Sequence, residues 1–163
     1  MKILGIEHIG IAVSDLNQAS SFWGNVLKMK ILGIEHIGVA VNDLNKASSF
    51  WGNVLNILHT HTEEVKSEQV STKIYDTNKG KIELLSPLST NSLIEKFINK
   101  KGPGIHHVCL EVDDINAAII ELKKEKIILI NDKPKIGAEG FKIVFIHPKS
   151  TGGVLVELAE KPS

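Results

Sequence analysis

The chain has 163 residues, of which 42% are hydrophobic and 23% charged, enough to form one ordinary domain with its own core. Nineteen lysines balance nineteen acidic residues and there is no arginine, so the net charge argues against nucleic acid as a partner. A single cysteine, Cys109, excludes an intramolecular disulfide, and without a signal peptide or an apolar run of roughly 20 residues we expect a cytoplasmic protein that spans no membrane.

The chain opens on a tandem repeat of 28 residues. Residues 1–28 and 29–56 differ only at the pairs Ile11/Val39, Ser14/Asn42, Gln18/Lys46 and Lys28/Asn56. Two copies are too few for a solenoid, so we interpret the first as a surplus βα segment in front of a domain at 29–163. We expect the second copy to build the fold because it continues directly into Ile57, whereas use of the first requires closing a loop at roughly 3 kcal/mol.

A fainter repeat indicates two modules. Residues 34–47 can be laid over residues 105–118, which aligns His36 with His107. Each stretch is a β-branched run, typical of a strand, and ends in an aspartate pair or Asn-Asp pair that can cap a helix. The predicted helices are Asp43–Leu55 and Asp113–Lys124.

Three strands are predicted after each helix. They are Leu58–Glu64, Val70–Asp76 and Lys81–Leu85 in the first module, and Ile127–Ile130, Lys142–His147 and Val154–Leu158 in the second. The modules extend over about 29–88 and 103–160, with a linker helix at 92–101 between them. Each module thus consists of one strand, one helix and three further strands. Two such modules contain too few helices for a doubly wound parallel sheet, so the predicted class is α+β.

Each module carries a histidine on its first strand and a glutamate on its last. These residues are His36 and Glu83 in the first module, and His107 and Glu157 in the second. Singly, a strand histidine is more often structural, and a strand glutamate can face solvent because side chains alternate. The matched pairs favour a metal site instead, since two imidazoles and two carboxylates suit Co, Ni, Zn, Mn or Fe.

Other polar residues carry weaker signals. His59 and His61 alternate with threonines and are predicted to lie on an exposed strand face. His106 is predicted to point away from His107 in a structural role. Cys109 lies between apolar neighbours and is interpreted as a core residue rather than a nucleophile.

Four segments together resemble the methylmalonyl-CoA epimerase family of the vicinal oxygen chelate superfamily. They are Glu35–Val41, Ile82–Leu88, Gly104–Ile115 and His147–Leu158. The resemblance covers about residues 29–160 and implies two βαβββ modules that form a curved mixed sheet around one divalent metal. It places the metal ligands on His36, Glu83, His107 and Glu157; many relatives have Gln at the Glu83 position.

The resemblance also implies the reaction and the partners. Members interconvert (2R)- and (2S)-methylmalonyl-CoA, an acyl-CoA substrate, by metal-assisted removal and return of the C2 proton, and they are homodimers. Glu157 is implied as one acid/base group. The opposite group stays open: Lys73 aligns where some relatives carry Glu, and a water or another carboxylate is an alternative.

Three other readings use the same fold. A glyoxalase I-like metalloenzyme would need glutathione-binding arginines, which this chain lacks. An extradiol dioxygenase would use two histidines and one glutamate around iron, which leaves Glu83 without a role. A non-catalytic small-molecule binder typically lacks the complete ligand set, which is retained here.

Overall fold

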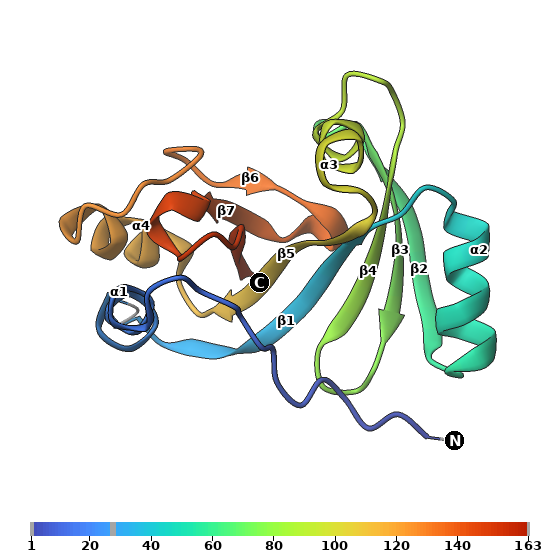
Figure 1. The fold of residues 1–163 in the computed structure, drawn as a ribbon, viewed down its shortest axis with the longest axis horizontal. Coiled ribbons are helices and arrows are strands. Elements are labelled where there is room, and N and C mark those ends of the chain that lie inside the picture. The colour runs from blue at the N-terminus through green and yellow to red at the C-terminus, as the bar shows by residue number, and fades with distance from the viewer. Residues whose placement is uncertain (1, 27–28, 163) are drawn as a thin grey trace. The chain divides into compact units, whose positions relative to one another are not determined.

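The computed structural model describes residues 2–26 and 29–162, and they form two compact units (Figure 1). Unit 1 contains residues 2–7 and 36–106, and unit 2 contains residues 8–35 and 107–162 apart from the two undescribed positions. Strands β1 (Ile31–Ala40) and β5 (Gly104–Val112) contribute residues to both units. No helix of the described residues is long and apolar enough to cross a bilayer.

The sheet of unit 1 has the strand order β2-β3-β4-β1. Strand β2 (Leu58–Val65) is antiparallel to β3 (Val70–Asp76), and β3 is antiparallel to β4 (Lys81–Pro87). Strand β4 is parallel to β1. The turn between β3 and β4 has Gly80 at φ 80°, a conformation that costs glycine little, and the three predicted strands of this module are confirmed.

The helical segment after β1 starts at an aspartate cap and then widens. The Asp43 carboxylate accepts hydrogen bonds from the N–H groups of Asn45 at 2.8 Å and Lys46 at 3.1 Å. Helix α2 (Leu44–Ser48) continues into a π-helical turn, Ser49–Val54. Its apolar side packs on one face of the sheet, where the partly buried members Leu44, Ala47, Trp51 and Leu55 meet Ile57, Tyr75, Ile82 and Leu84.

Helix α3 (Leu93–Lys101) covers the other side of this sheet, as the predicted linker helix. Ser92 caps it, since its hydroxyl accepts a hydrogen bond from the Glu95 N–H at 3.0 Å. Its apolar residues pack with strand residues in a cluster of Ala40, Val70, Leu85, Ile94, Phe97 and Ile98.

The sheet of unit 2 has the strand order β5-β8-β7-β6. Strand β8 (Val156–Glu160) is parallel to β5 and antiparallel to β7 (Lys142–Ile146). The short strand β6 (Lys135–Ile136) pairs with β7, and helix α4 (Ile115–Lys124) packs on the face of the main core.

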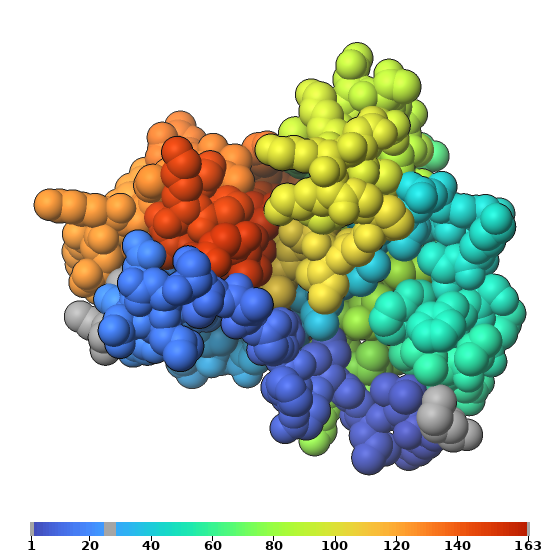
Figure 2. Space-filling model, viewed as in Figure 1, coloured from blue at the N-terminus to red at the C-terminus, as the bar shows by residue number. Residues whose placement is uncertain are grey.

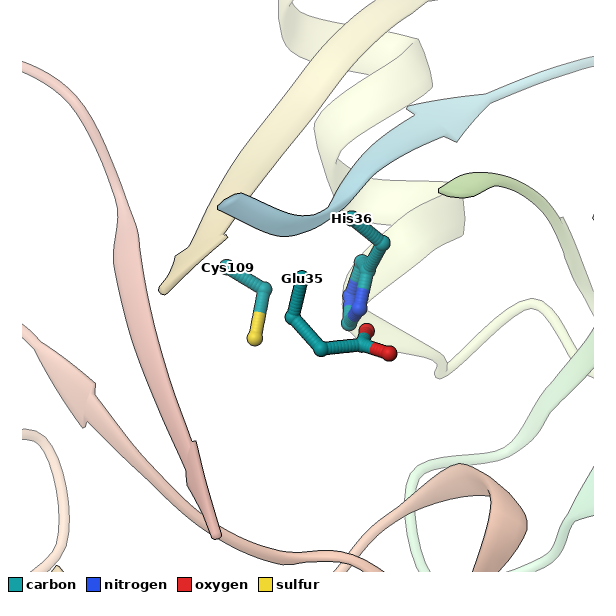
Figure 3. Close-up of side chains that lie close together, drawn as sticks. All are labelled: Glu35, His36 and Cys109. Atoms are coloured by element: carbon teal, nitrogen blue, oxygen red, sulfur yellow. The ribbon is translucent and has the colours of Figure 1, made fainter. Parts of the chain in front are cut away.

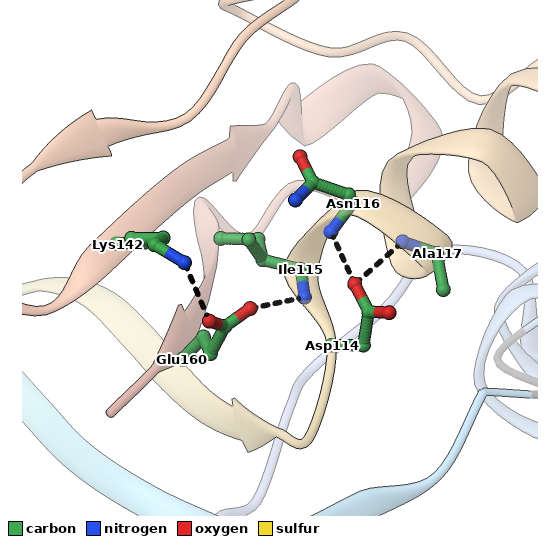
Figure 4. A network of polar contacts seen from close by, with 6 residues as sticks. All are labelled: Asp114, Ile115, Asn116, Ala117, Lys142 and Glu160. Carbon is green, nitrogen blue, oxygen red and sulfur yellow. Dashed lines mark hydrogen bonds and ion pairs between the residues drawn. The ribbon is translucent and has the colours of Figure 1, made fainter. Parts of the chain in front are cut away.

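Helix α4 is tied to the end of β8 by a polar network (Figure 4). Asp114 caps the helix by accepting hydrogen bonds from the N–H groups of Asn116 and Ala117, both at 2.9 Å. The Glu160 carboxylate accepts the Ile115 N–H and the Lys142 ammonium, each at 2.8 Å. The start of the helix is therefore held to a strand 45 residues further along the chain.

The second copy of the repeat builds β1 and α2, as predicted, and the first copy takes other positions. Residues 2–14 form no strand; the Ile6 N–H donates to the Lys79 carbonyl in unit 1 at 2.9 Å. Helix α1 (Leu16–Ser20) and the π-helical turn Ser21–Val26 belong to unit 2. Phe22, 3% exposed, lies in the core of unit 2, and Figure 2 shows the described part of the first copy that belongs to this unit, in blue, against the C-terminal part in red.

The α+β class is confirmed, and two predicted elements need correction. Residues 127–130 form no full strand. Leu129 makes only an isolated bridge with Ile146, because side chains accept hydrogen bonds from the backbone N–H groups beside it. Ser150 Oγ accepts the Ile128 N–H at 3.1 Å, which stops the ladder from extending. The last strand begins at Val156 rather than Val154, and the predicted strand of the first copy is not formed because the second copy fills that place.

Candidate metal centre

In unit 1 a histidine and a glutamate meet on adjacent parallel strands. Glu83 of β4 is the register partner of Gly38, and His36 is two residues earlier on β1 and therefore on the same face. His36 Nε2 lies 3.3 Å from Glu83 Oε2, and the two side chains are only 12% and 7% exposed.

Unit 2 repeats this arrangement with its own pair. Glu157 of β8 is the register partner of Cys109, and His107 precedes Cys109 by two residues. His107 Nε2 lies 3.0 Å from Glu157 Oε2, with side chains 5% and 6% exposed. The Phe145 ring packs edge-on against the imidazole, with 5.8 Å between ring centroids, and so fixes the orientation of His107.

The donor chemistry of both pairs fits a divalent transition metal. Such ions take imidazole nitrogen and carboxylate oxygen, and a buried carboxylate needs a compensating positive charge. Two ligands at about 2.1 Å from a tetrahedral ion lie roughly 3.4 Å apart, close to the separations within the two pairs. Each unit therefore supplies one nitrogen and one oxygen donor in a suitable local geometry.

Glu35 is a buried carboxylate that the sequence did not single out. It is 6% exposed and immediately precedes His36 on β1, and Figure 3 shows its side chain together with those of His36 and Cys109. A Glu35 oxygen and the Cys109 sulfur, both in unit 2, lie within 4.8 Å of each other. The one feature of the sequence that could have indicated its burial is the position of an acidic residue inside an apolar strand. Cys109 itself is fully buried beside Phe141 and Ile143, as predicted for a core residue.

Lys73 is not on the side of the sheet that carries Glu83. Its register partner on β4 is Leu84, whereas Glu83 pairs with Ile74, so the Lys73 side chain lies on the opposite face. This placement removes Lys73 as the group that would exchange a proton across a substrate held near Glu83. Thr72 is on the Glu83 face instead, 1% exposed, and its hydroxyl has no hydrogen-bond partner in the described part of the chain.

The remaining histidines separate into structural and exposed positions. His106 stacks edge-on against Phe97 of α3, with 5.0 Å between ring centroids, as expected for a structural role. His61 is exposed and lies 3.5 Å from Glu63. His8 is exposed in the irregular first segment, so His36 of the second copy is the histidine that meets Glu83.

Known proteins share both the sequence and the fold. The profile of the Glyoxalase/Bleomycin resistance protein/Dioxygenase superfamily matches residues 35–145. The mitochondrial methylmalonyl-CoA epimerase of Mus musculus is 43% identical over 160 residues, 98% of this chain and 74% of the mouse protein. The methylmalonyl-CoA epimerase structure from Mycobacterium tuberculosis has a TM-score of 0.80 at 31% identity and covers 83% of this chain and 92% of that one. A methylmalonyl-CoA epimerase in complex with methylmalonyl-CoA and NH4+ has a TM-score of 0.78 at 28% identity, over 82% and 97%.

Proposed function

This chain belongs to the methylmalonyl-CoA epimerase family of the Glyoxalase/Bleomycin resistance protein/Dioxygenase superfamily, and we propose that it interconverts (2R)- and (2S)-methylmalonyl-CoA. The observation that carries the proposal is the buried His–Glu pair that recurs at corresponding strand positions of the two modules. An acyl-CoA with a carboxylate on C2 is the matching substrate class, as in the complex cited above.

His36, Glu83, His107 and Glu157 are the proposed ligands of one divalent metal, which we expect to be Co, Ni, Zn or Mn. When bound, the metal supplies a Lewis acid that acidifies the C2–H bond and stabilises the enolate. The four side chains would hold the ion, and their strands provide rigid supports for them.

Proton transfer is assigned to protein carboxylates. Glu157 is proposed to remove the C2 proton and return it, since a carboxylate near the reacting carbon is a suitable general base. Its neighbour His107, 3.0 Å away, holds its orientation. Inversion requires a second donor on the opposite side of the carbon; with Lys73 on the other sheet face, a water or another carboxylate is proposed for this step.

Exchange of the C2 proton for deuterium, followed by NMR with the metal content measured in parallel, tests the proposal. We expect Glu157→Gln to abolish exchange while the folded state persists, because the amide cannot accept the proton. Glu111→Gln is the control and should exchange normally, because it alters a carboxylate of β5 that is paired with Lys161 at 2.9 Å and is not a proposed ligand. Wild-type exchange in Glu157→Gln would exclude Glu157 as the base, and no exchange in the metal-loaded wild type would favour a binding protein.

We also propose a quaternary state and a compartment for this chain. A homodimer is expected from the family, and the second copy leaves Phe50 and Val54 exposed at 48% and 64%, available for a partner. A cytoplasmic location is proposed because the buried Cys109 forms no disulfide. Light scattering should give twice the 17.9 kDa mass of one chain.

A further inference from the structure

A polar hollow of about 270 Å³ lies in unit 1 between the α2 segment and strands β2 and β3. It is lined by Asn45, Ser48, Ser49, Gly52, Asn53, His59, Lys73 and Tyr75. Lys73 and Tyr75 share the sheet face opposite Glu83, so this hollow is separate from the His36–Glu83 pair. No carboxylate is part of its lining.

The helical side of the hollow is a polar stripe. Its members follow one another at the spacing i, i+3, i+4, i+7 and i+8, which places residues on one side of a helix, and they run from Asn45 to Asn53. The apolar side of this segment packs on the sheet, and the polar stripe lies beside it, with Asn45, Ser49 and Asn53 exposed at the edge of the hollow. The stripe crosses into the π-helical turn, a rare conformation that often accompanies functional sites.

Gly52 lines the hollow beside the Tyr75 ring. A Cβ atom placed there would lie 3.4 Å from Tyr75 Cε1 and 3.9 Å from the Tyr75 hydroxyl. Both separations are ordinary van der Waals contacts. The glycine thus leaves space beside a tyrosine that is itself 3% exposed.

The sheet side supplies positive charge. In the part of the chain that the structure describes, the Lys73 ammonium makes no ion pair with a carboxylate. His59 lies beside Tyr75, with 5.4 Å between ring centroids, and its Nε2 is 2.8 Å from Thr62 Oγ1. Glu64 lies on the same face of the hairpin, but it pairs in register with Ser71 and does not line the hollow. An ammonium among hydroxyls and amides attracts an anion, and lysine binds phosphate as a point charge.

The repeat provides an internal comparison. The same stripe in the first copy, at Asn17, Ser20, Ser21 and Gly24, is exposed, and a Cβ atom at Gly24 would meet nothing within 4 Å. In the second copy the same helix residues lie beside Lys73, His59 and Tyr75 and line the hollow with them.

We propose that this hollow binds a phosphate group, with Lys73 as the counter-charge and the stripe of α2 as the source of hydrogen bonds. The phosphate has two possible sources, the nucleotide part of the CoA substrate or free inorganic phosphate. The first source rests on the proposed epimerase function, and the second does not.

The test uses the full chain with Lys73→Met and, independently, Ser49→Asp, which places a negative charge in the hollow. The matched controls are Lys66→Met, an exposed lysine on the same hairpin, and Ser21→Asp, the same substitution in the first copy. Inorganic phosphate is titrated by calorimetry, and KM is measured with methylmalonyl-CoA and with the methylmalonyl thioester of N-acetylcysteamine, which lacks phosphate.

If the CoA phosphate is the ligand, Lys73→Met and Ser49→Asp raise KM for methylmalonyl-CoA about tenfold or more and leave KM for the short thioester unchanged. If free phosphate is the ligand, both variants abolish the phosphate titration without changing either KM. Either pattern supports the proposal when the controls behave as wild type. A wild type that binds no phosphate, together with unchanged KM values in both variants, overturns it. Failure of the epimerase proposal appears differently, as no turnover of either thioester, while the phosphate titration still reports on the hollow.

Discussion

Thr72 combines deep burial with an unused hydroxyl. Its side chain is 1% exposed, and Oγ1 has no partner in the described residues. A buried unpaired hydroxyl costs about 1–3 kcal/mol, so replacing it by a methyl group of the same shape removes this cost without creating a cavity. We expect Thr72→Val to keep or increase the free energy of unfolding in urea, and Thr72→Ala to lower it.

The contrast between the two Thr72 variants is the measurement that matters. Thr72→Ala removes a methyl group as well as the hydroxyl, and the space it leaves is the reason for its lower stability. A loss of more than about 1 kcal/mol in Thr72→Val would show that the hydroxyl has a partner in solution, such as a buried water.

Glu160 makes the stability of unit 2 sensitive to acid. The Ile115 N–H, and after it the Lys142 ammonium, hold the pKa of the Glu160 carboxyl below its usual value. Because the folded state has the lower pKa, the stabilisation is complete above the unfolded pKa of about 4.3 and is lost as the pH falls through the folded value. We expect the stability difference between wild type and Glu160→Gln to be largest at neutral pH and to shrink toward pH 3.

Urea unfolding at several pH values between 7 and 3 measures this difference. Lys142→Met is the control, because it removes the second partner and leaves the Ile115 bond, so it should retain part of the pH dependence. The same pair raises the pKa of Lys142, which adds a contribution that is present below about pH 10 and is lost as the pH rises through the folded value. If the difference in unfolding free energy between wild type and Glu160→Gln stayed constant from pH 7 to pH 3, the Glu160 carboxyl would not be the source of the acid sensitivity.

The sequence predicted the members of each His–Glu pair, because two copies of one module repeat both residues at matching positions. It left Lys73 open as one candidate for the second acid/base group, because a strand alternates its faces and a shift of one residue transfers a side chain to the opposite side. Glu35 was missed for a related reason: burial of a charged side chain depends on neighbours from distant strands, which a linear pattern does not specify.

At the scale of elements, strands with continuous apolar or alternating patterns were predicted closely, and boundaries set by side-chain hydrogen bonds were not. Val70–Asp76 was predicted to the residue. The expected strand at Ile127–Ile130 became a single bridge because Ser150 Oγ and Asn131 Oδ1 take backbone N–H groups beside it. The π-helical turn also carries no pattern that distinguishes it from an α-helix of the same residues.

The two helical copies allow one substitution to be compared in two environments. Phe22 and Phe50 occupy the same position of an identical Ser-Ser-Phe-Trp-Gly-Asn-Val segment, yet they are 3% and 48% exposed. Truncation of a buried phenylalanine costs about 3–5 kcal/mol, and truncation of an exposed one costs far less. We expect Phe22→Ala to lower the free energy of unfolding by several times as much as Phe50→Ala, measured in urea. Equal losses would show that the first copy is not packed on unit 2.

At the scale of the whole chain, removal of residues 1–28 is expected to lower the stability of the fold without removing the proposed metal site. The second copy supplies β1, α2 and His36, so the deleted chain keeps every proposed ligand. If the first copy is surplus, as the sequence indicates, the deleted chain should be fully active. The structure adds a cost, because Phe22 and Ala19 are buried with unit 2 and Ile6 bonds to Lys79 in unit 1.

We therefore expect the chain of residues 29–163 to retain its metal and its C2 proton exchange per folded molecule, while its unfolding midpoint in urea falls below that of Phe22→Ala. The deletion removes more buried apolar area than one phenylalanine does, and it exposes apolar residues of the core cluster that contains Phe22, which favours self-association. Metal analysis, the deuterium exchange assay and light scattering on the same sample distinguish these effects. Loss of the metal from a deleted chain that remains folded would show that His8, rather than His36, is the working ligand, and an unchanged unfolding midpoint would show that the first copy contributes nothing to the fold.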